Sequence, residues 1–301
     1  MALPNTYYRL DYIIFSGSQK IDTGTNLAMS HEHYKMKFYP TSAGEKYIFY
    51  HNKYPQPYSS LSFMSSNKLT YSVAYQATVN VGNYSTMNMW YEVEYTSHSV
   101  SSSTFVVNGD SYDLTYGSRT LDSASANCEI GRSYEGRLEY FEVYDQDTLI
   151  RNFIPVMRKS DSVVGMYDLV NDVFYTNAGT GTFSYGSIIY NVSATVSPEN
   201  SGTVTGTGNY PSGTSVTLTA TPNSGYKFKN WKLSDDTVSD TNPLTFTVTD
   251  DSSLIAYFDR SANCRIKVNG TWEYGMMYVK VNGEWKLGTL KIKQGTWKGA
   301  I

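Results

Sequence analysis

Short stretches of this chain alternate apolar and polar residues with a period of two. Residues 34–38 (YKMKF) set three large side chains against two lysines, and residues 216–220 (VTLTA) set three apolar side chains against two threonines. Such alternation predicts antiparallel strands with one buried and one solvated face. No segment keeps the period of about 3.6 residues that marks an amphipathic helix. The pattern therefore predicts an all-β protein.

One hairpin can be placed from its turn. Asn108 and Gly109 lie between two runs of strand-forming residues. A two-residue hairpin turn needs positive φ at both central positions, which Asn and Gly tolerate. We therefore expect a tight β-hairpin at this pair, preceded by a strand that begins near Trp90.

Composition narrows the classes of function. The chain has 301 residues, enough for one large core and one or two small modules. A formal net charge of -3 gives no positive electrostatic field that would attract nucleic acid. No run of apolar residues approaches the roughly 18 that a membrane-spanning helix needs. We expect neither nucleic acid as a partner nor membrane insertion. Cys128 and Cys264 lie in different predicted modules, so we expect free thiols.

The two ends of the segment 1–188 each carry a distinctive sequence pattern. Residues 10–24 are LDYIIFSGSQKIDTG, and residues 149–158 (LIRNFIPVMR) lead into residues 165–183 (GMYDLVNDVFYTNAGTGTF). This pattern resembles that of modular virion proteins of bacteriophages, whose main domain is a laminin-G or concanavalin-like jelly roll. The resemblance implies a jelly-roll sandwich over residues 1–188, with its first and last strands together.

From residue 189 the composition changes to Thr, Ser, Val, Gly and Asn. The segment contains GYKFKNW at 225–231 and LIAYF at 254–258. It resembles the divergent internalin B-repeat, a small all-β repeat of bacterial surface proteins. The resemblance implies a second domain over residues 189–259 whose aromatic residues supply most of the core. A single copy suits a spacer or docking unit.

A repeat occupies the last forty residues. Residues 266–272 (IKVNGTW), 279–285 (VKVNGEW) and 290–297 (LKIKQGTW) align, which predicts a tail of short β-hairpins over residues 260–301. Similar Lys-Val-Asn-Gly-x-Trp tails occur at the ends of phage structural proteins. Eight basic residues against two acidic ones give the tail a charge of +6.

Hairpins this small bury little surface by themselves. Tryptophans at matched positions would then remain exposed, as is typical of interfaces. We expect an assembly interface, either in a homo-oligomer, with a trimer as the first hypothesis, or against another virion protein. The predicted interface residues are Trp272, Trp285 and Trp297.

Acidic residues were considered as catalysts. On a strand, Glu92 and Glu94 project from one face, as paired acids do in concanavalin-like glucanases. Those enzymes carry a third acid at close spacing, which is absent here. Glu139, Glu142 and Asp145 have a spacing of three, which should spread them over both faces of a strand. We interpret these groups as solvated surface acids and expect a non-enzymatic protein without catalytic residues.

Histidines are few. His31 and His33 could bind a metal from one strand face, but a site needs further ligands and only two other histidines exist. We interpret both as polar surface residues and expect no metal and no cofactor.

Tyrosine is abundant, with 28 residues. Tyr50, Tyr54 and Tyr58 lie around two prolines that prevent a regular central strand, so this segment is expected to be an edge or loop. Aromatic rings beside Asn and Gln suit sugar recognition, and they also suit protein interfaces or the domain's own core. The three tyrosines are the candidate glycan-binding residues.

Module order indicates a phage virion protein: a tail fibre, a capsid decoration or a host-attachment component, assembled in the host cytoplasm. Residues 1–9 lack the basic start and apolar stretch of a secretory signal, which favours this hypothesis. Expected partners are other virion proteins and a host-surface glycan. The alternatives are a carbohydrate-active enzyme on the same scaffold and a bacterial cell-surface adhesin.

Overall fold

The computed structural model describes most of the chain. The described residues are 2–26, 32–42, 44, 46–52, 59–63, 69–73, 77–80, 84, 86–99, 101–115, 127–233, 236–261, 264–268, 271–275 and 278–287. Every regular element among them is a β-strand, which confirms the predicted all-β class. The chain forms two compact units, Met1–Ile189 and Tyr190–Ile301. The three-domain division at residues 188 and 259 stays a prediction.

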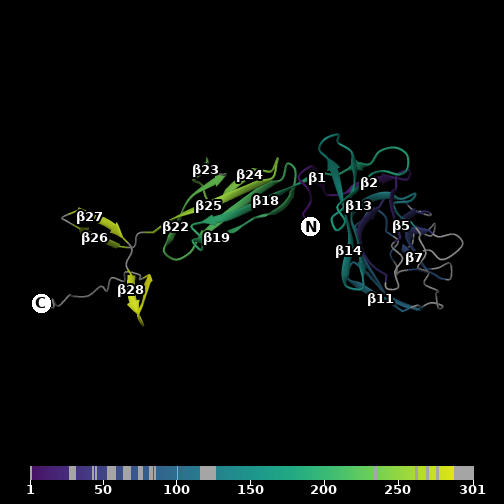
Figure 1. The fold of residues 1–301 in the computed structure, drawn as a ribbon, viewed down its shortest axis with the longest axis horizontal. Helices are drawn as coiled ribbons and strands as arrows, with labels where there is room; N and C mark the ends of the chain where they lie inside the picture. Colours follow the sequence, from purple (N-terminus) through teal and green to yellow (C-terminus); the bar gives the residue numbers. More distant parts are fainter. Residues whose placement is uncertain are drawn as a thin grey trace. The chain divides into compact units, whose positions relative to one another are not determined.

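The first unit contains two antiparallel sheets (Figure 1). The larger sheet has the order β11 (Asp110–Thr115), β10 (Ser102–Val107), β9 (Tyr91–Ser99), β4 (Glu32–Pro40), β13 (Glu135–Asp145), β14 (Thr148–Arg158) and β1 (Tyr7–Leu10). Four short strands extend it: β2 (Ile13–Ser16), β15 (Val164–Asp168), β16 (Val173–Tyr175) and β17 (Ser184–Tyr185). The six-stranded sheet has the order β3 (Ile21–Asn26), β12 (Asn127–Ile130), β5 (Lys46–Asn52), β6 (Ser59–Phe63), β7 (Leu69–Val73) and β8 (Ala77–Asn80).

An aromatic core joins the two sheets into a sandwich. Tyr34 of the larger sheet packs on Phe49 of the six-stranded sheet with ring centroids 5.0 Å apart, and Phe49 stacks on Phe141 at 5.6 Å. Met36 and Phe38 are buried as well, while the lysines between them are only partly buried. The predicted alternation in this strand is confirmed, and aromatic burial supplies much of the sandwich's stability.

The two ends of this domain lie together, as the resemblance implied. Ile14 of β2 pairs with Ser184 of β17. Asp168, which closes β15, is fully buried and accepts hydrogen bonds from the backbone of Asn152 and Val170. Gly165 has no room for a side chain, because a Cβ there would lie 2.2 Å from the carbonyl oxygen of Tyr175. The distinctive pattern at 149–183 therefore encodes the closure of the sandwich.

The predicted hairpin turn is confirmed. Asn108 and Gly109 connect β10 to β11, with φ values of 50° and 91°. Asn282 and Gly283 repeat the arrangement in the tail, with φ values of 51° and 85°. In both places the pair supplies the left-handed backbone that a two-residue turn requires.

The second unit is built from two groups of paired strands and two separate hairpins. One group contains β18 (Ile188–Ser197), β25 (Ser252–Arg260), β22 (Tyr226–Leu233), β23 (Asp236–Ser239) and β20 (Gly208–Pro211), and the first two residues of β18 pair with β1. The other group contains β19 (Gly202–Thr205), β21 (Ser215–Pro222) and β24 (Leu244–Thr247). The hairpins pair β26 (Cys264–Val268) with β27 (Thr271–Gly275) and β28 (Tyr278–Val281) with β29 (Glu284–Leu287).

Burial in the second unit follows the sequence pattern. Val216, Leu218 and Ala220 of β21 are buried, and the threonines between them are not. Trp231 is fully buried, and its ring lies 5.6 Å from that of Phe228. Large aromatic side chains thus anchor this small core, as expected from the limited surface that so short a module can bury.

Candidate functional site

Tyr50 is the one candidate glycan-binding tyrosine that the structure describes. It lies on β5, and its ring is in edge contact with that of Tyr47 at 5.0 Å. The guanidinium carbon of Arg132 lies 4.5 Å from the centre of the Tyr50 ring. Tyr54 and Tyr58 lie outside the described residues. Their predicted role stays a prediction.

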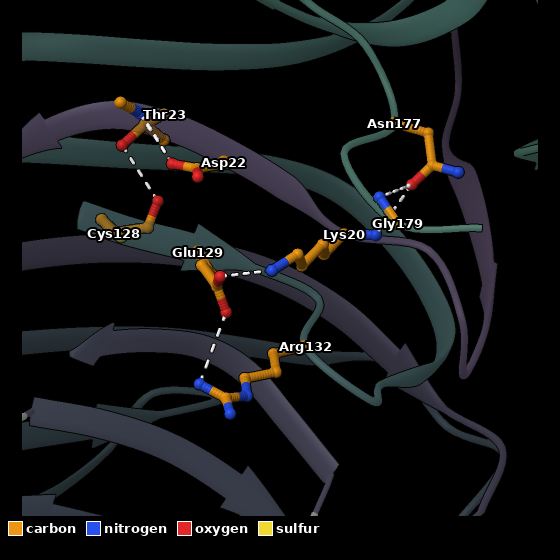
Figure 2. Close-up of polar contacts among 9 residues, drawn as sticks. Lys20, Asp22, Thr23, Cys128, Glu129, Arg132, Asn177 and Gly179 are labelled. Atoms are coloured by element: carbon orange, nitrogen blue, oxygen red, sulfur yellow. Dashed lines mark hydrogen bonds and ion pairs between the residues drawn. The ribbon is translucent and has the colours of Figure 1, made fainter.

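Arg132 is held in place from two directions. Its carbonyl oxygen accepts a hydrogen bond from the backbone of Tyr47, at 3.1 Å, which ties the turn after β12 to β5. Its side chain lies 3.6 Å from Oε2 of Glu129. The other carboxylate oxygen of Glu129 accepts a hydrogen bond from Nζ of Lys20 at 2.5 Å. Figure 2 shows Glu129 between the two cations.

Lys20 is itself fixed by the closing segment of the domain. Its backbone nitrogen donates to Oδ1 of Asn177 at 3.0 Å, and the same oxygen accepts a hydrogen bond from the backbone of Gly179 (Figure 2). The Glu129 side chain is only 14% exposed, so its charge is compensated by cations rather than by water. The result is a rigid chain of contacts from Lys20 to the Tyr50 ring.

Backbone pairing extends this arrangement across the whole six-stranded sheet. The register aligns one residue of each strand in a row, and five of the six are Asp, Glu, Ser or Thr. In sheet order they are Asp22, Glu129, Tyr50, Ser60, Ser72 and Thr78. We call Lys20, Asp22, Tyr50, Glu129 and Arg132 the Tyr50 face. It combines an aromatic ring that contacts a cation with charged donors and acceptors from neighbouring segments.

Sequence reasoning found only Tyr50 of this group. Lys20, Tyr50 and the Glu129–Arg132 pair come from three segments far apart in the chain, and strand pairing brings these segments together. No local pattern marks them.

The acids considered as catalysts are engaged with partners of their own. Glu94 accepts a hydrogen bond from Nε2 of His33 at 2.7 Å and forms an ion pair with Lys35 at 3.1 Å. Glu92 is exposed, and its Oε1 accepts a hydrogen bond of 2.9 Å from the hydroxyl group of Tyr140. Burial, reinforced by this hydrogen bond, raises the pKa of Tyr140 well above its usual value.

The interpretation of His33 as a surface residue is wrong. Its side chain is 12% exposed, and its ring stacks on that of Tyr144 at 4.6 Å. The cause is cross-strand pairing, which sets Tyr144 directly opposite His33. His31 lies outside the described residues. Within the described part of the chain, no three His, Cys, Asp or Glu side chains gather as metal ligands would. Cys128 is buried as a free thiol.

The expected distribution of Glu139 and Glu142 over two faces is also wrong. The register of β13 shifts between Leu138 and Tyr140, so one extra residue enters the strand. A bulge reverses the alternation beyond it. Neither glutamate faces the core: Glu139 pairs with Lys37 at 2.7 Å, and Glu142 accepts a hydrogen bond from Tyr144. Asp145 is exposed at the end of β13.

The structure describes the three tail tryptophans to different extents. Trp285 on β29 is 67% exposed, and Nζ of Lys280 lies 5.7 Å from its ring centre. Trp272 lies on β27, opposite Lys267. Trp297 lies outside the described residues. The predicted interface role of all three stays a prediction.

Comparison with known protein families finds a match within the second unit. The family model of the divergent internalin B-repeat domain matches residues 192–262. The predicted similarity of this segment is therefore confirmed. No curated protein matches the chain in sequence.

Solved structures with some similarity include a galectin of Caenorhabditis elegans and the binding domain of botulinum neurotoxin serotype G. The galectin is 14% identical, with 48% of this chain and 100% of the galectin covered and a TM-score of 0.31. The neurotoxin domain is 10% identical, with 86% of this chain and 73% of that domain covered and a TM-score of 0.28. Among the described residues, no helix has the length and apolar character needed to cross a bilayer.

Proposed function

We propose that this chain is a non-enzymatic attachment protein whose sandwich domain binds a glycan on the Tyr50 face. The observation that carries the proposal is the immobilised Tyr50 ring, fixed by Arg132, Glu129 and Lys20 from neighbouring strands. A ring that is already held in place loses little conformational entropy when a sugar packs on it. Charged donors and acceptors beside the ring can exchange water for sugar hydroxyl groups.

The non-enzymatic assignment is supported by the surroundings of Glu92 and Glu94. Glycoside hydrolysis needs one carboxylate that is free to attack or activate water and one acid that holds its proton. Glu94 is engaged by His33 and Lys35, and Glu92 is an exposed acceptor of a hydrogen bond from Tyr140. Neither carboxylate lies in the kind of apolar pocket that keeps a catalytic acid protonated.

We assign the protein to a phage virion, as a fibre, decoration or host-attachment component. The order of its modules supports this assignment. A bacterial cell-surface adhesin is the second candidate, and the internalin B-repeat match at residues 192–262 favours it. Immunogold labelling separates the two: virion particles should carry the label if the first assignment holds, and bacterial envelopes should carry it if the second does.

The tail is proposed as the element that assembles the protein, as a homotrimer or against another virion protein. Trp285 and Val281 expose 67% and 42% of their surface on one hairpin, which is unusual for residues of this size. Sedimentation of the full chain and of Trp285→Ser should give a larger species for the former. Equal sedimentation coefficients together with unchanged incorporation into particles would exclude Trp285 from the interface.

The glycan proposal is tested with a printed array of neutral oligosaccharides and the full-length chain. Tyr50→Ala should weaken binding about tenfold, as expected when one stacked ring is lost. Tyr185→Ala is the matched control, because Tyr185 is exposed on β17 of the same domain. Full binding by Tyr50→Ala would refute the Tyr50 face as the site. Release of reducing sugar that Glu92→Gln abolishes would replace the proposal with the enzymatic alternative.

A further inference from the structure

A second cluster of aromatic and cationic side chains lies on the other sheet of the sandwich. The guanidinium carbon of Arg137, on β13, is 4.7 Å from the ring centre of Tyr39 and 4.9 Å from that of Tyr12. Trp90 completes the group, with its ring centre 5.5 Å from that of Tyr39 and 5.8 Å from that of Tyr12. All four side chains are half-buried. We call them the Arg137 cluster.

Among the residues that the structure describes, Arg137 has no carboxylate partner, whereas the cations around it do. Lys37, which lies over the Trp90 ring, is paired with Glu139 at 2.7 Å. Glu135, two residues before Arg137, is paired with Lys46 at 2.7 Å. Among the described residues, no carboxylate lies within ion-pair distance of Arg137. Its charge is therefore available for an external anion.

Contact with two tyrosine rings restricts Arg137 before any anion arrives. A side chain that is already restricted loses less conformational entropy on binding. The planar fork of a guanidinium group matches both oxygens of a carboxylate and can form two parallel charge-assisted hydrogen bonds.

The position of the cluster favours a sugar over a peptide. Peptides that bind sheets usually add a strand at a free edge. At Arg137 the backbone is paired on both sides, with Ile14 of β2 and with Tyr39 of β4, so no edge is available. What remains is a group of half-buried rings, inclined to one another, around one cation. A pyranose ring offers apolar C–H groups for the rings, and a carboxylate substituent would reach the cation.

We propose that the Arg137 cluster is a second binding site, specific for a carboxylated sugar such as a uronic or sialic acid residue. The Arg137 guanidinium binds the carboxylate. Trp90, with the exposed edges of Tyr12 and Tyr39, packs against the sugar ring. The site lies on a different sheet from the Tyr50 face and does not depend on it.

The test uses two small probes that differ only in the acid group, methyl β-glucuronide and methyl β-glucoside, titrated into the full-length chain and followed by NMR. The glucuronide should bind at least tenfold more tightly than the glucoside, because a hydrogen bond to a charged group is worth more than one to a neutral hydroxyl. Its affinity should fall with added salt. Equal affinity for both probes, or no binding of the glucuronide, would overturn the proposal.

Variants then locate the site. Arg137→Gln should abolish the preference for the glucuronide, and Arg137→Lys should restore only part of it, since lysine keeps the charge but not the planar fork. Loss of glucuronide binding in Arg137→Gln, with unchanged binding of that variant to the array of neutral oligosaccharides, separates this site from the Tyr50 face. If Arg137→Gln does not fold, Trp90→Leu replaces it and should weaken both probes while preserving the preference. A capped acidic peptide that competes as well as the glucuronide would reassign the site to a protein partner.

Discussion

Asp168 and Arg137 belong to the same domain, but they differ in whether the surrounding residues compensate their charge. Asp168 is 0% exposed and accepts hydrogen bonds from two backbone nitrogens and from Nδ2 of Asn171, with Arg151 at 3.6 Å. Arg137 is half-buried between aromatic rings and has no carboxylate partner among the described residues. The first charge is satisfied entirely within the chain, which is the condition for burial. The second is oriented but uncompensated, which suits a ligand.

The comparison predicts that loss of Asp168 damages the fold and loss of Arg137 does not. Asp168→Ala should lower the free energy of unfolding by about 3–5 kcal/mol, because it leaves Arg151 and several donors without their partner. Urea denaturation measures this. Asp145→Ala, at the exposed end of β13, is the control and should stay within about 0.5 kcal/mol of the parent chain. A similar loss in Arg137→Gln would make the Arg137 cluster a structural element instead.

Asn177 offers an intermediate case, because it belongs to the closing segment and also touches the Tyr50 face. Its side chain accepts hydrogen bonds from the backbone of Lys20 and Gly179 and donates to the carbonyl groups of Thr180 and Gly181. Asn177→Ala should cost about 1–3 kcal/mol of stability and weaken neutral-glycan binding through Lys20. Glucuronide binding by the folded protein should not change.

Asn177→Asp is the matched variant, since it keeps the two accepted hydrogen bonds and loses the two donated ones. Its loss of stability should lie between those of the parent chain and Asn177→Ala. If both variants reduce glucuronide binding as strongly as neutral-glycan binding, the two faces are not independent.

The same contrast explains how much could be predicted from the sequence. The alternation at residues 34–38 and the turn residue Asn108 are local signals. They correctly predicted a strand and a hairpin. The pattern at residues 149–183 was recognisable because sandwich closure demands Asp168 and Gly165 at fixed positions, so it indicated a fold and not a chemistry. A binding face does not require particular residues at fixed spacings in one segment, because strand pairing assembles it from distant segments.

Arg132 illustrates this limit, since it reaches Tyr50 only through the pairing of β12 with β5. A single bulge between Leu138 and Tyr140 has a comparable effect on the other sheet. It places Glu139 and Glu142 away from the core, against the simple period of two. Neither the pairing of distant strands nor the bulge has a signature in the spacing of residues.

The smallest expected effect concerns Glu135, which lies two residues from Arg137 and, unlike it, has a partner. The hydrogen bond from Lys46, 2.7 Å long, lowers the pKa of Glu135 from its ordinary value of 4.5. A carboxyl whose pKa is lowered in the folded state stabilises that state above its ordinary pKa and loses this contribution as the pH falls through the lowered value. Glu135→Gln should therefore be slightly less stable than the parent chain at pH 7, and the difference should vanish once the pH falls below the lowered pKa, as followed by urea denaturation. Because both side chains are partly exposed, solvent screens the pair and the effect stays small. If the difference persisted unchanged at low pH, the ion pair would not be its cause, and the distinction between a compensated Glu135 and an uncompensated Arg137 would lose its energetic basis.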